Sequence, residues 1–298
     1  MKKIILVAGA TGNLGNKIIH ELLLDADVRA IVRPQTDETK IQYLASKGVK
    51  ICSVKEFSIE EVAIACQGVH CVVSAVAGLE DTIIHTQKIL LQGAIKANVP
   101  RFIPSDFCTD FTNLVEGKNR NLDTRRKFHT YLNQHPIQAT SIFNGAFMEL
   151  TTGDMPLILF DKNKILAWGN SSIKMDFTTT YNVAAYTAFA ALDSTAPRYL
   201  KIAGDSLSCD DVVRTMTELT ATPYKIFRPG GISLLSSIIA IARFFDFGKK
   251  ELYPAWQGMQ YMRDMMEGKA VIHLHDNDRY PITWTKLKTY IQAEKYTT

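Results

Sequence analysis

The chain has 298 residues, of which 46% are hydrophobic and 21% are charged, and its formal net charge is +4. This composition supports a sizeable core and excludes a disordered or highly charged chain. The densest basic run, Arg125-Arg126-Lys127, is too short to indicate nucleic-acid binding. Five cysteines, an odd number without a C-x-x-C pair, argue against a disulfide framework or a zinc site and fit a reducing compartment.

Two apolar stretches superficially resemble targeting or membrane segments. The run at residues 4–8 is shorter than the apolar region of a signal peptide. The stretch at residues 232–245 contains serines and Arg243, and it falls short of the roughly 20 residues that span a bilayer. We therefore expect a soluble, cytoplasmic protein with no membrane partner.

The first 150 residues alternate between short apolar runs, typical of buried strands, and segments with helical spacing of apolar residues. The expected strands are 3–8, 28–32, 49–54, 69–76, 101–104 and 137–143. The expected helices are 13–24, 41–47, 59–66, 81–97 and 121–133, the third opened by a capping box of Ser58 and Glu61. Buried strands separated by helices predict an α/β fold with a doubly wound, mostly parallel Rossmann sheet.

The second half is less regular. A hairpin is expected from residues 155–160 and 164–168, a helix at 181–192 and a strand at 199–202. Ser208 and Asp211 form a second capping box that opens a helix to residue 219, and mostly helices follow residue 227. We expect residues 1–150 to form the dinucleotide-binding domain, with 176–203 returning to it. Residues 151–298 would then form a smaller, mainly helical lobe that binds substrate.

A glycine-rich turn follows the first expected strand and opens the first expected helix. It has the spacing G-x-x-G-x-x-G in the run Gly9-Ala10-Thr11-Gly12-Asn13-Leu14-Gly15. Gly9 permits the tight turn, Gly12 lets backbone N–H groups approach a pyrophosphate, and Gly15 lets the helix pack closely. The positive end of the helix then faces the phosphates. The alternative is a glycine turn that binds nothing.

The end of the second strand indicates which dinucleotide is bound. An acidic residue there would hold a ribose 2′-hydroxyl, but the chain has Arg33, and the first acid after it is Asp37. A guanidinium forms charge-assisted, bidentate contacts with a phosphate, and Lys40 could add charge. These residues predict NADPH, unless Arg33 simply projects into solvent.

Several segments resemble NmrA-like and isoflavone-reductase-like proteins, which are atypical short-chain dehydrogenases. The resemblance rests on VAGATGNLG, on Val32-Arg33-Pro34, on RFIPSDF at residues 101–107 and on ATSIFNGAFMEL at residues 139–150. It covers the first 150 residues well and continues loosely to about residue 211. It implies a Rossmann domain that binds NADPH, a smaller C-terminal lobe and a substrate cleft.

Reductases of this family carry a general acid–base lysine on the helix after the fifth strand, which the resemblance places at Lys127. Such a lysine would protonate the substrate as hydride arrives. The alternative is a solvated lysine in a basic run. Cys108 also departs from the family, whose reductases often have glycine after the motif corresponding to Ser105-Asp106-Phe107. Some NmrA-like proteins, moreover, bind the dinucleotide as regulators without chemistry.

Ligands of open α/β sheets bind at the carboxyl ends of the strands, which adds residues after the later strands to the expected site. The expected cofactor contacts are Gly9, Thr11, Gly12, Asn13, Leu14, Gly15, Arg33, Lys40, Ala75, Val76, Ser105, Phe107, Lys127 and Asn144. Pro104 and Asp106 would border the nicotinamide region. Asn144, Phe147 and Met148 are the candidates for the substrate pocket, with apolar packing as the alternative.

Three other patterns carry less weight. Tyr43 and Lys47 match Y-x-x-x-K, but they follow the second strand, far from where short-chain dehydrogenases need this pair. A run at residues 273–276, with two histidines and an aspartate, is read as a polar loop rather than a metal site. Cys108 is read as a bystander thiol. No metal is expected.

The sequence therefore predicts an NADPH-dependent oxidoreductase that reduces a small, fairly apolar carbonyl, enone or quinone-type substrate. The alternative is a non-catalytic, NADPH-sensing regulator that binds a partner protein. A sugar-nucleotide epimerase or dehydratase is a third possibility, weakened by the missing Y-x-x-x-K on the proper helix. The sequence indicates neither the substrate's identity nor the oligomeric state.

Overall fold

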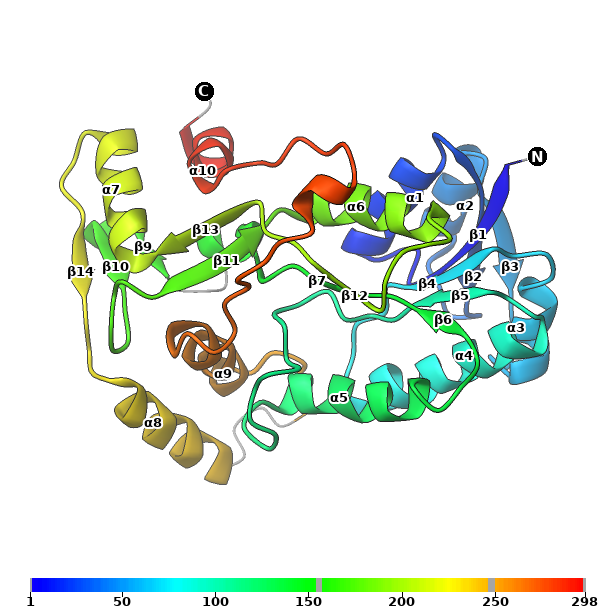
Figure 1. Cartoon of the computed structure of the whole chain (residues 1–298), viewed down its shortest axis with the longest axis horizontal. Coiled ribbons are helices and arrows are strands. Elements are labelled where there is room, and N and C mark those ends of the chain that lie inside the picture. Colours follow the sequence, from blue (N-terminus) through cyan, green and yellow to red (C-terminus); the bar gives the residue numbers. More distant parts are fainter. Residues whose placement is uncertain (1, 154–156, 246–249, 297–298) are drawn as a thin grey trace. The chain divides into compact units, whose positions relative to one another are not determined.

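The computed structural model describes residues 2–153, 157–245 and 250–296. The chain forms two compact units that are interleaved along the sequence (Figure 1). The first comprises Met1–Phe107, Thr124–Ile142 and Val183–Leu200, and the second comprises Cys108–Asp123, Phe143–Asn182 and Lys201–Thr298. The sequence places one boundary near residue 150, because local periodicity reports elements and not the unit that each element joins.

A six-stranded sheet forms the centre of the first unit, with the strand order β3-β2-β1-β4-β5-β6. All neighbouring strands in it are parallel. The strands are β1 (Lys3–Ala8), β2 (Ala26–Val32), β3 (Lys50–Ser53), β4 (Cys71–Ser74), β5 (Arg101–Ile103) and β6 (Gln138–Ala139). This order is that of the Rossmann fold. Successive strands are added on one side of β1 as far as β3 and on its other side from β4 onward, so the topological switch point lies between β1 and β4. The predicted α/β Rossmann fold is confirmed.

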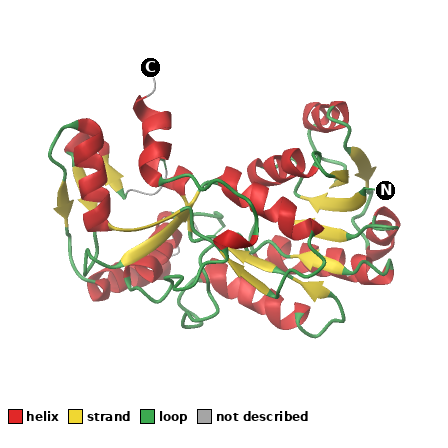
Figure 2. Ribbon diagram, turned by 45° about the horizontal axis from the view of Figure 1, so that its top comes forward, coloured by secondary structure: helices red, strands yellow, loops and turns green. Residues whose placement is uncertain are grey.

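Helices cover both faces of this sheet (Figures 1 and 2). They are α1 (Asn13–Leu22), α2 (Glu38–Ser46), α3 (Ile59–Ala65), α4 (Gln87–Lys96), α5 (Arg120–Leu132) and α6 (Thr180–Leu192). Ile5, Leu6 and Val7 of β1 are fully buried, as expected for a strand enclosed on both sides. On one face, Leu90 and Leu91 of α4 pack with Phe128 of α5 in a single apolar cluster.

The expected long helix at residues 81–97 begins with a π-helical turn, η1 (Asp81–Thr86), before it continues as α4. Apolar periodicity does not reveal such a turn, because it samples the segment at the α-helical period. π-helical turns are rare and frequently occur at functional sites. The direction of the side chains at residues 81–86 therefore could not be derived from the sequence.

The expected strand at residues 137–143 is divided into β6 and β7 (Ser141–Phe143). The chain changes partner at this point: Thr140 N donates to Phe102 O of β5 at 3.0 Å, whereas Ser141 N donates to Arg198 O at 2.9 Å. Accordingly, β7 pairs with β12 (Tyr199–Lys201) in a separate two-stranded sheet. The expectation that the strand near residue 199 returns to the main sheet is thus wrong, because β7 takes it as a partner.

The second unit contains two three-stranded sheets as well as helices. The sheets are formed by β8 (Ala146–Phe147), β11 (Lys174–Thr178) and β13 (Asp205–Ser208), and by β9 (Ile158–Leu159), β10 (Lys164–Leu166) and β14 (Lys225–Phe227). The helices are α7 (Cys209–Thr220), α8 (Ile232–Phe244), α9 (Ala255–Met266) and α10 (Leu287–Tyr296), with 3-10 turns η2 (Met148–Thr152), η3 (Phe160–Lys162) and η4 (Asn277–Arg279).

Several local predictions in the second unit hold. Strands β9 and β10 are antiparallel, which confirms the hairpin, although residues 155 and 156 of its expected first strand lie outside the described residues. The capping box of Ser208 and Asp211 is present at the start of α7, with both of its hydrogen bonds formed. Within the described ranges, every helix is too short or too polar to span a membrane.

Arg101 at the start of β5 connects this strand to two later segments of the first unit. It is 1% exposed, and its guanidinium donates to Thr140 Oγ1 at 2.7 Å and to Gln138 Oε1 at 3.2 Å. It also donates to the carbonyl oxygens of Ser194 at 3.2 Å and Ala196 at 3.3 Å. One buried side chain therefore satisfies acceptors on β6 and on the segment before β12.

Replacing Arg101 should therefore lower stability strongly. Arg101→Met retains much of the length but leaves these acceptors without a donor, and we expect the free energy of unfolding to fall by on the order of 3 kcal/mol. Arg101→Lys keeps the charge with fewer donors, so its free energy of unfolding should lie between those of wild type and Arg101→Met. Urea unfolding followed by circular dichroism measures both, and a wild-type midpoint for Arg101→Met would contradict this role.

Candidate functional site

The glycine turn joins β1 to α1 in the first unit. Gly9 has φ +79°, a left-handed conformation that suits glycine, and an added Cβ there would overlap the carbonyl of Ala75 at the end of β4. An added Cβ at Gly15 would overlap Gly9 O, so the first turn of α1 lies directly against the turn. Gly12 N donates to Gly9 O at 3.0 Å, which closes the turn. Steric constraint therefore explains the two outer glycines.

The N-terminus of α1 is suited to an anion. Gly12 precedes the helix without a side-chain cap, and the first turn carries no acidic residue. The Asn13 side chain accepts a hydrogen bond from Lys17 rather than capping the helix. The first N–H groups of a helix have no intrahelical acceptor, and the helix dipole favours negative charge there. Thr11 and Leu14 flank this position and are half-buried.

Arg33 follows β2 directly and lies in a defined environment. Its Nη2 donates to Thr86 Oγ1 of η1 at 2.8 Å, and its guanidinium carbon lies 4.8 Å from the centre of the Phe57 ring. Among the described residues Arg33 has no ion pair. The nearest acid in sequence, Asp37, accepts the backbone N–H of Thr39 at 2.8 Å and so caps α2. Hydrogen bonding, first from the Thr39 side chain, lowers the pKa of Asp37.

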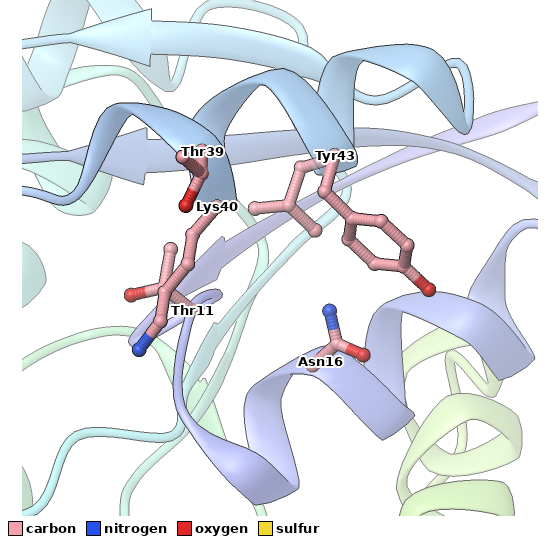
Figure 3. A pocket seen from close by; sticks show the side chains of 6 residues that line it. Thr11, Asn16, Thr39, Lys40 and Tyr43 are labelled. Carbon is pink, nitrogen blue, oxygen red and sulfur yellow. The ribbon is translucent and has the colours of Figure 1, made fainter.

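A pocket of about 320 Å³ lies between α1 and α2. It is lined by Thr11, Asn16, Thr39, Lys40, Tyr43 and Leu44. Figure 3 shows the Lys40 side chain extending toward Thr11, and the Tyr43 hydroxyl pointing toward the helix that carries Asn16. Lys40 thus brings a positive charge to the same side of the sheet as the glycine turn. Lys47, in turn, lies with its ammonium 5.5 Å from the Tyr43 ring centre.

Ser105 connects the ends of β4 and β5. It is 4% exposed, its hydroxyl donates to Val76 O at 2.6 Å, and its N–H donates to Gln87 Oε1 at 2.8 Å. These bonds give Ser105 a structural role at this sheet edge. Ala75 and Val76 remain half-buried beside it, whereas Phe107 is buried. Gln87, the first residue of α4, was not identified from the sequence. It is fully buried, and a glutamine among the apolar residues of the expected helix is the one sequence feature that could have indicated a role.

The basic run on α5 presents its residues to different surroundings. Lys127 is exposed, with 58% of its side chain accessible, and its Nζ lies 3.5 Å from Glu80 Oε1. Arg125, by contrast, is 9% exposed, and its Nε donates to Ser105 O at 3.0 Å. Arg125 therefore reaches the carboxyl end of β5, whereas Lys127 is paired with Glu80. Gap-free counting along the sequence could not show this difference, because it depends on the rotation of α5.

A buried polar cluster surrounds Asp106 in the first unit. The Asp106 carboxylate is bonded to His129 Nε2 and accepts a hydrogen bond from Ser141 Oγ at 2.7 Å. Arg198 Nη1 donates to Ser141 Oγ at 2.7 Å, and His129 stacks on Tyr199 with ring centres 6.2 Å apart. Burial opposes ionisation of Asp106, yet the charge of His129, the hydrogen bonds and the charge of Arg125 hold its pKa below the usual value.

The three candidates for the substrate pocket lie in the second unit. Asn144 is fully buried: its N–H donates to Cys108 O at 2.9 Å, and its carbonyl accepts from Thr178 Oγ1 at 2.7 Å. Its side-chain Oδ1 has no hydrogen-bond partner among the described residues. Met148 is buried in the apolar core of this unit, which agrees with apolar packing, the alternative to a substrate contact. Phe147 is half-buried. Cys108 is 8% exposed.

The histidine-containing run at residues 273–276 lies in a loop of the second unit, as predicted. His275 Nε2 is 3.4 Å from Asp176 Oδ1, and Asp176 also accepts the N–H of Ile272 at 2.8 Å. Within the described part of the chain, no group of three or more histidine, cysteine or acidic side chains is arranged to hold a metal ion.

Residues 1–250 match the NmrA-like family. The chain belongs to the NmrA-like family. This NmrA-like protein is 27% identical to pinoresinol reductase 2 of Arabidopsis thaliana over 202 residues, a match that spans 62% of this chain and 63% of that protein. It is also 27% identical to the oxidoreductase aprR of Aspergillus flavus over 230 residues, or 74% of this chain and 75% of that protein.

Solved structures extend the likeness to nearly the whole chain. AtPrR2 with NADP+ and (+)-pinoresinol has a TM-score of 0.80 and 22% identity, with 98% of this NmrA-like protein and 99% of that chain covered. The NADPH-dependent quinone oxidoreductase QOR2 of Escherichia coli, complexed with NADPH, has a TM-score of 0.74 and 16% identity, with 97% and 99% covered. At these identities the likeness establishes the shared fold.

The two outer glycines should differ from Gly12 in their tolerance of a side chain. Gly15→Ala forces α1 away from Gly9 O, and we expect it to lower the free energy of unfolding by about 1–3 kcal/mol. Gly12→Ala is the matched control, because Gly12 has φ −79° and its added Cβ meets only Gly9 O, at 3.3 Å. Equal unfolding midpoints for the two variants would show that the close approach is not required.

The buried carboxylate of Asp106 predicts a dependence of stability on pH. Its pKa is lowered by folding, so its contribution is present above the unfolded value of about 3.9 and is lost as the pH falls through the folded value. Asp106→Asn should therefore cost on the order of 3 kcal/mol at pH 7 and make unfolding less sensitive to pH below about 5. Urea unfolding at several pH values measures this.

The exposed Asp27 on β2 provides the control for that experiment. Asp27→Asn should leave both the stability at pH 7 and the acid dependence close to wild type. Other carboxyl groups with lowered pKa values give the acid slope that all variants share: Asp37, Glu60, Glu61, Asp211 and Glu218. If the free energy of unfolding of Asp106→Asn and of wild type changes with pH in parallel, the Asp106 carboxylate does not contribute to the acid dependence of stability.

Proposed function

We propose that this protein is an NADPH-dependent reductase of a small, fairly apolar carbonyl, enone or quinone-type substrate. The observation that carries the proposal is the Arg33 guanidinium, which lies at the end of β2 without a carboxylate partner among the described residues. The first unit also offers an uncapped helix N-terminus behind the glycine turn. One feature suits a 2′-phosphate, and the other suits a pyrophosphate.

The residues of the first unit fit this cofactor. The backbone of residues 11–15 would hold the pyrophosphate, Arg33 and Lys40 would bind the 2′-phosphate, and Ala75 and Val76 would pack beside the dinucleotide at the end of β4. Phe107 is a further proposed contact. NADPH supplies a hydride when bound, and the protein's part is to orient it and exclude competing reactions. The relatives support this class, since their names include pinoresinol reductase and NADPH-dependent quinone oxidoreductase.

Two side chains on α5 are candidates for handling charge at the substrate. We retain Lys127 as the proposed proton donor, which requires its ammonium group to leave Glu80 for the substrate. A guanidinium is a poor proton donor, so Arg125 would stabilise negative charge that develops on the substrate oxygen, with water supplying the proton. In either case one hydride and one proton add across the reduced bond. A regulator without chemistry is not favoured, because the named relatives are reductases and oxidoreductases.

The activity can be tested by following NADPH oxidation with a panel of quinones, enones and aryl ketones. Wild type should consume NADPH with at least one of these acceptors. If Lys127 is the proton donor, Lys127→Ala should lose about 10²-fold or more in turnover while it binds NADPH as wild type does. Glu80→Gln is the control, because it breaks the same ion pair and keeps the lysine.

Each outcome of this test has a distinct meaning. A loss of less than about tenfold in Lys127→Ala would assign the lysine to the solvated surface, and Arg125→Met would then be the variant with the larger loss. If wild type binds NADPH tightly and consumes none of it with any acceptor, the reductase proposal fails. Partners that bind only the NADPH-loaded protein would then be sought.

The choice of cofactor has its own test. Arg33→Ala should weaken NADPH binding by about 10- to 100-fold, since a hydrogen bond to a charged group contributes about 1.5–3 kcal/mol. NADH binding should stay within about twofold, because NADH lacks the 2′-phosphate. Titration calorimetry with both dinucleotides measures this, and an unchanged preference for NADPH in Arg33→Ala would remove the argument for that cofactor.

A further inference from the structure

Arg33 has a long side chain that would lose many rotamers on binding a ligand if it were free in solution. In this protein it is held before any ligand arrives. One nitrogen of the guanidinium, Nη2, donates to Thr86 Oγ1 at 2.8 Å, and the guanidinium carbon lies over the Phe57 ring, 4.8 Å from its centre. Preorganisation of this kind raises affinity by lowering the entropic cost of binding. The groups that hold Arg33 therefore bear on what it recognises.

Thr86 is well placed to fix one edge of the guanidinium. It is 8% exposed and ends the π-helical turn η1, directly before Gln87. Gln87 is fully buried and bonded at both ends of its amide, donating to Ile83 O at 2.8 Å and accepting from Ser105 N at 2.8 Å. The turn that carries Thr86 is thus tied to the end of β5, and its hydroxyl is a fixed acceptor.

Phe57 places its ring against the Arg33 guanidinium and has an unusual backbone. Its φ is +54°, a left-handed conformation that is uncommon for a bulky residue. The Glu61 carboxylate holds this loop by accepting the backbone N–H groups of Lys55 at 2.7 Å, Glu56 at 3.0 Å and Ser58 at 3.4 Å. Phe57 also packs against the apolar cluster of the first unit. The loop held by the capping box thus places the Phe57 ring between the apolar cluster and Arg33.

We propose that Phe57 and Thr86 are positioning residues that set the preference for a 2′-phosphorylated dinucleotide by holding the Arg33 guanidinium in one orientation. The proposal rests on the proposed function, because it concerns the NADPH site. Thr86 occupies one of the five N–H donors, and no other hydrogen bond from the guanidinium to a described residue is present. The remaining edge is therefore open to two oxygens of one phosphate.

The hydroxyl of Thr86 can be tested with a matched pair of variants. Thr86→Val keeps the shape and removes the acceptor, whereas Thr86→Ser keeps the acceptor. Thr86→Val should lower the ratio of NADPH to NADH affinity by about threefold to tenfold, the effect of one neutral hydrogen bond. Thr86→Ser should restore most of the ratio. NADH affinity should stay unchanged in both, since it does not use the 2′-phosphate.

The ring of Phe57 can be tested with a similar pair of variants. Phe57→Leu keeps an apolar side chain on the core and removes the aromatic face, and it should lower the same ratio by about twofold to fivefold. Phe57→Tyr keeps the face and should behave as wild type. Adenosine 2′,5′-bisphosphate and adenosine 5′-monophosphate are the second pair of probes, because they report the 2′-phosphate in ligands without nicotinamide.

A double-mutant cycle shows whether these residues act through Arg33. In an Arg33→Ala background, Thr86→Val and Phe57→Leu should have no further effect on the ratio. An unchanged ratio in both single variants overturns the proposal, as does an equal loss of NADPH and NADH affinity, which would indicate general damage. If Arg33→Ala keeps the wild-type preference, the assignment of the 2′-phosphate to Arg33 is itself wrong. Failure of the positioning proposal alone leaves that assignment intact.

Discussion

The close approach of α1 to the end of β1 is the constraint on which the first unit's site depends. An added Cβ at Gly15 would overlap Gly9 O, and one at Gly9 would overlap Ala75 O, so three chain segments meet with no room for side chains. This contact aims the amino end of α1 at the carboxyl edge of the sheet. The direction of the helix dipole, and hence the place where an anion is favoured, follows from that contact.

The polar groups at the same sheet edge are buried and paired. Ser105 connects β4, α4 and α5 through its hydroxyl, N–H and carbonyl groups. Asp106 then lies among His129, Ser141 and Arg125 rather than in open solvent. The segment at residues 101–107 that resembles a known family is therefore largely structural: Arg101, Ser105 and Asp106 hold the strands and helices around the site. Its half-buried neighbours Ala75 and Val76 are better placed to meet a ligand.

The sequence was sufficient wherever a signal is local. The glycine turn, both capping boxes, the alternation of strands and helices as far as β5 and the position of Arg33 all follow from residues close together in the chain. It was insufficient where partners are distant. The rotation of α5 that buries Arg125 and exposes Lys127 depends on packing against the sheet. The change of partner at Ser141 depends on Arg198, and the contact of Arg33 with Thr86 depends on a π-helical turn.

The interleaving of the two units has a consequence during synthesis. The first unit is completed only by Val183–Leu200, because Arg198 covers Ser141 and the segment before it accepts the hydrogen bonds of Arg101. Translation adds about 5–20 residues per second, so several seconds pass between the appearance of β6 and that of β12. Throughout this interval Arg101 lacks its acceptors at Ser194 and Ala196, and Ser141 lacks its donor Arg198.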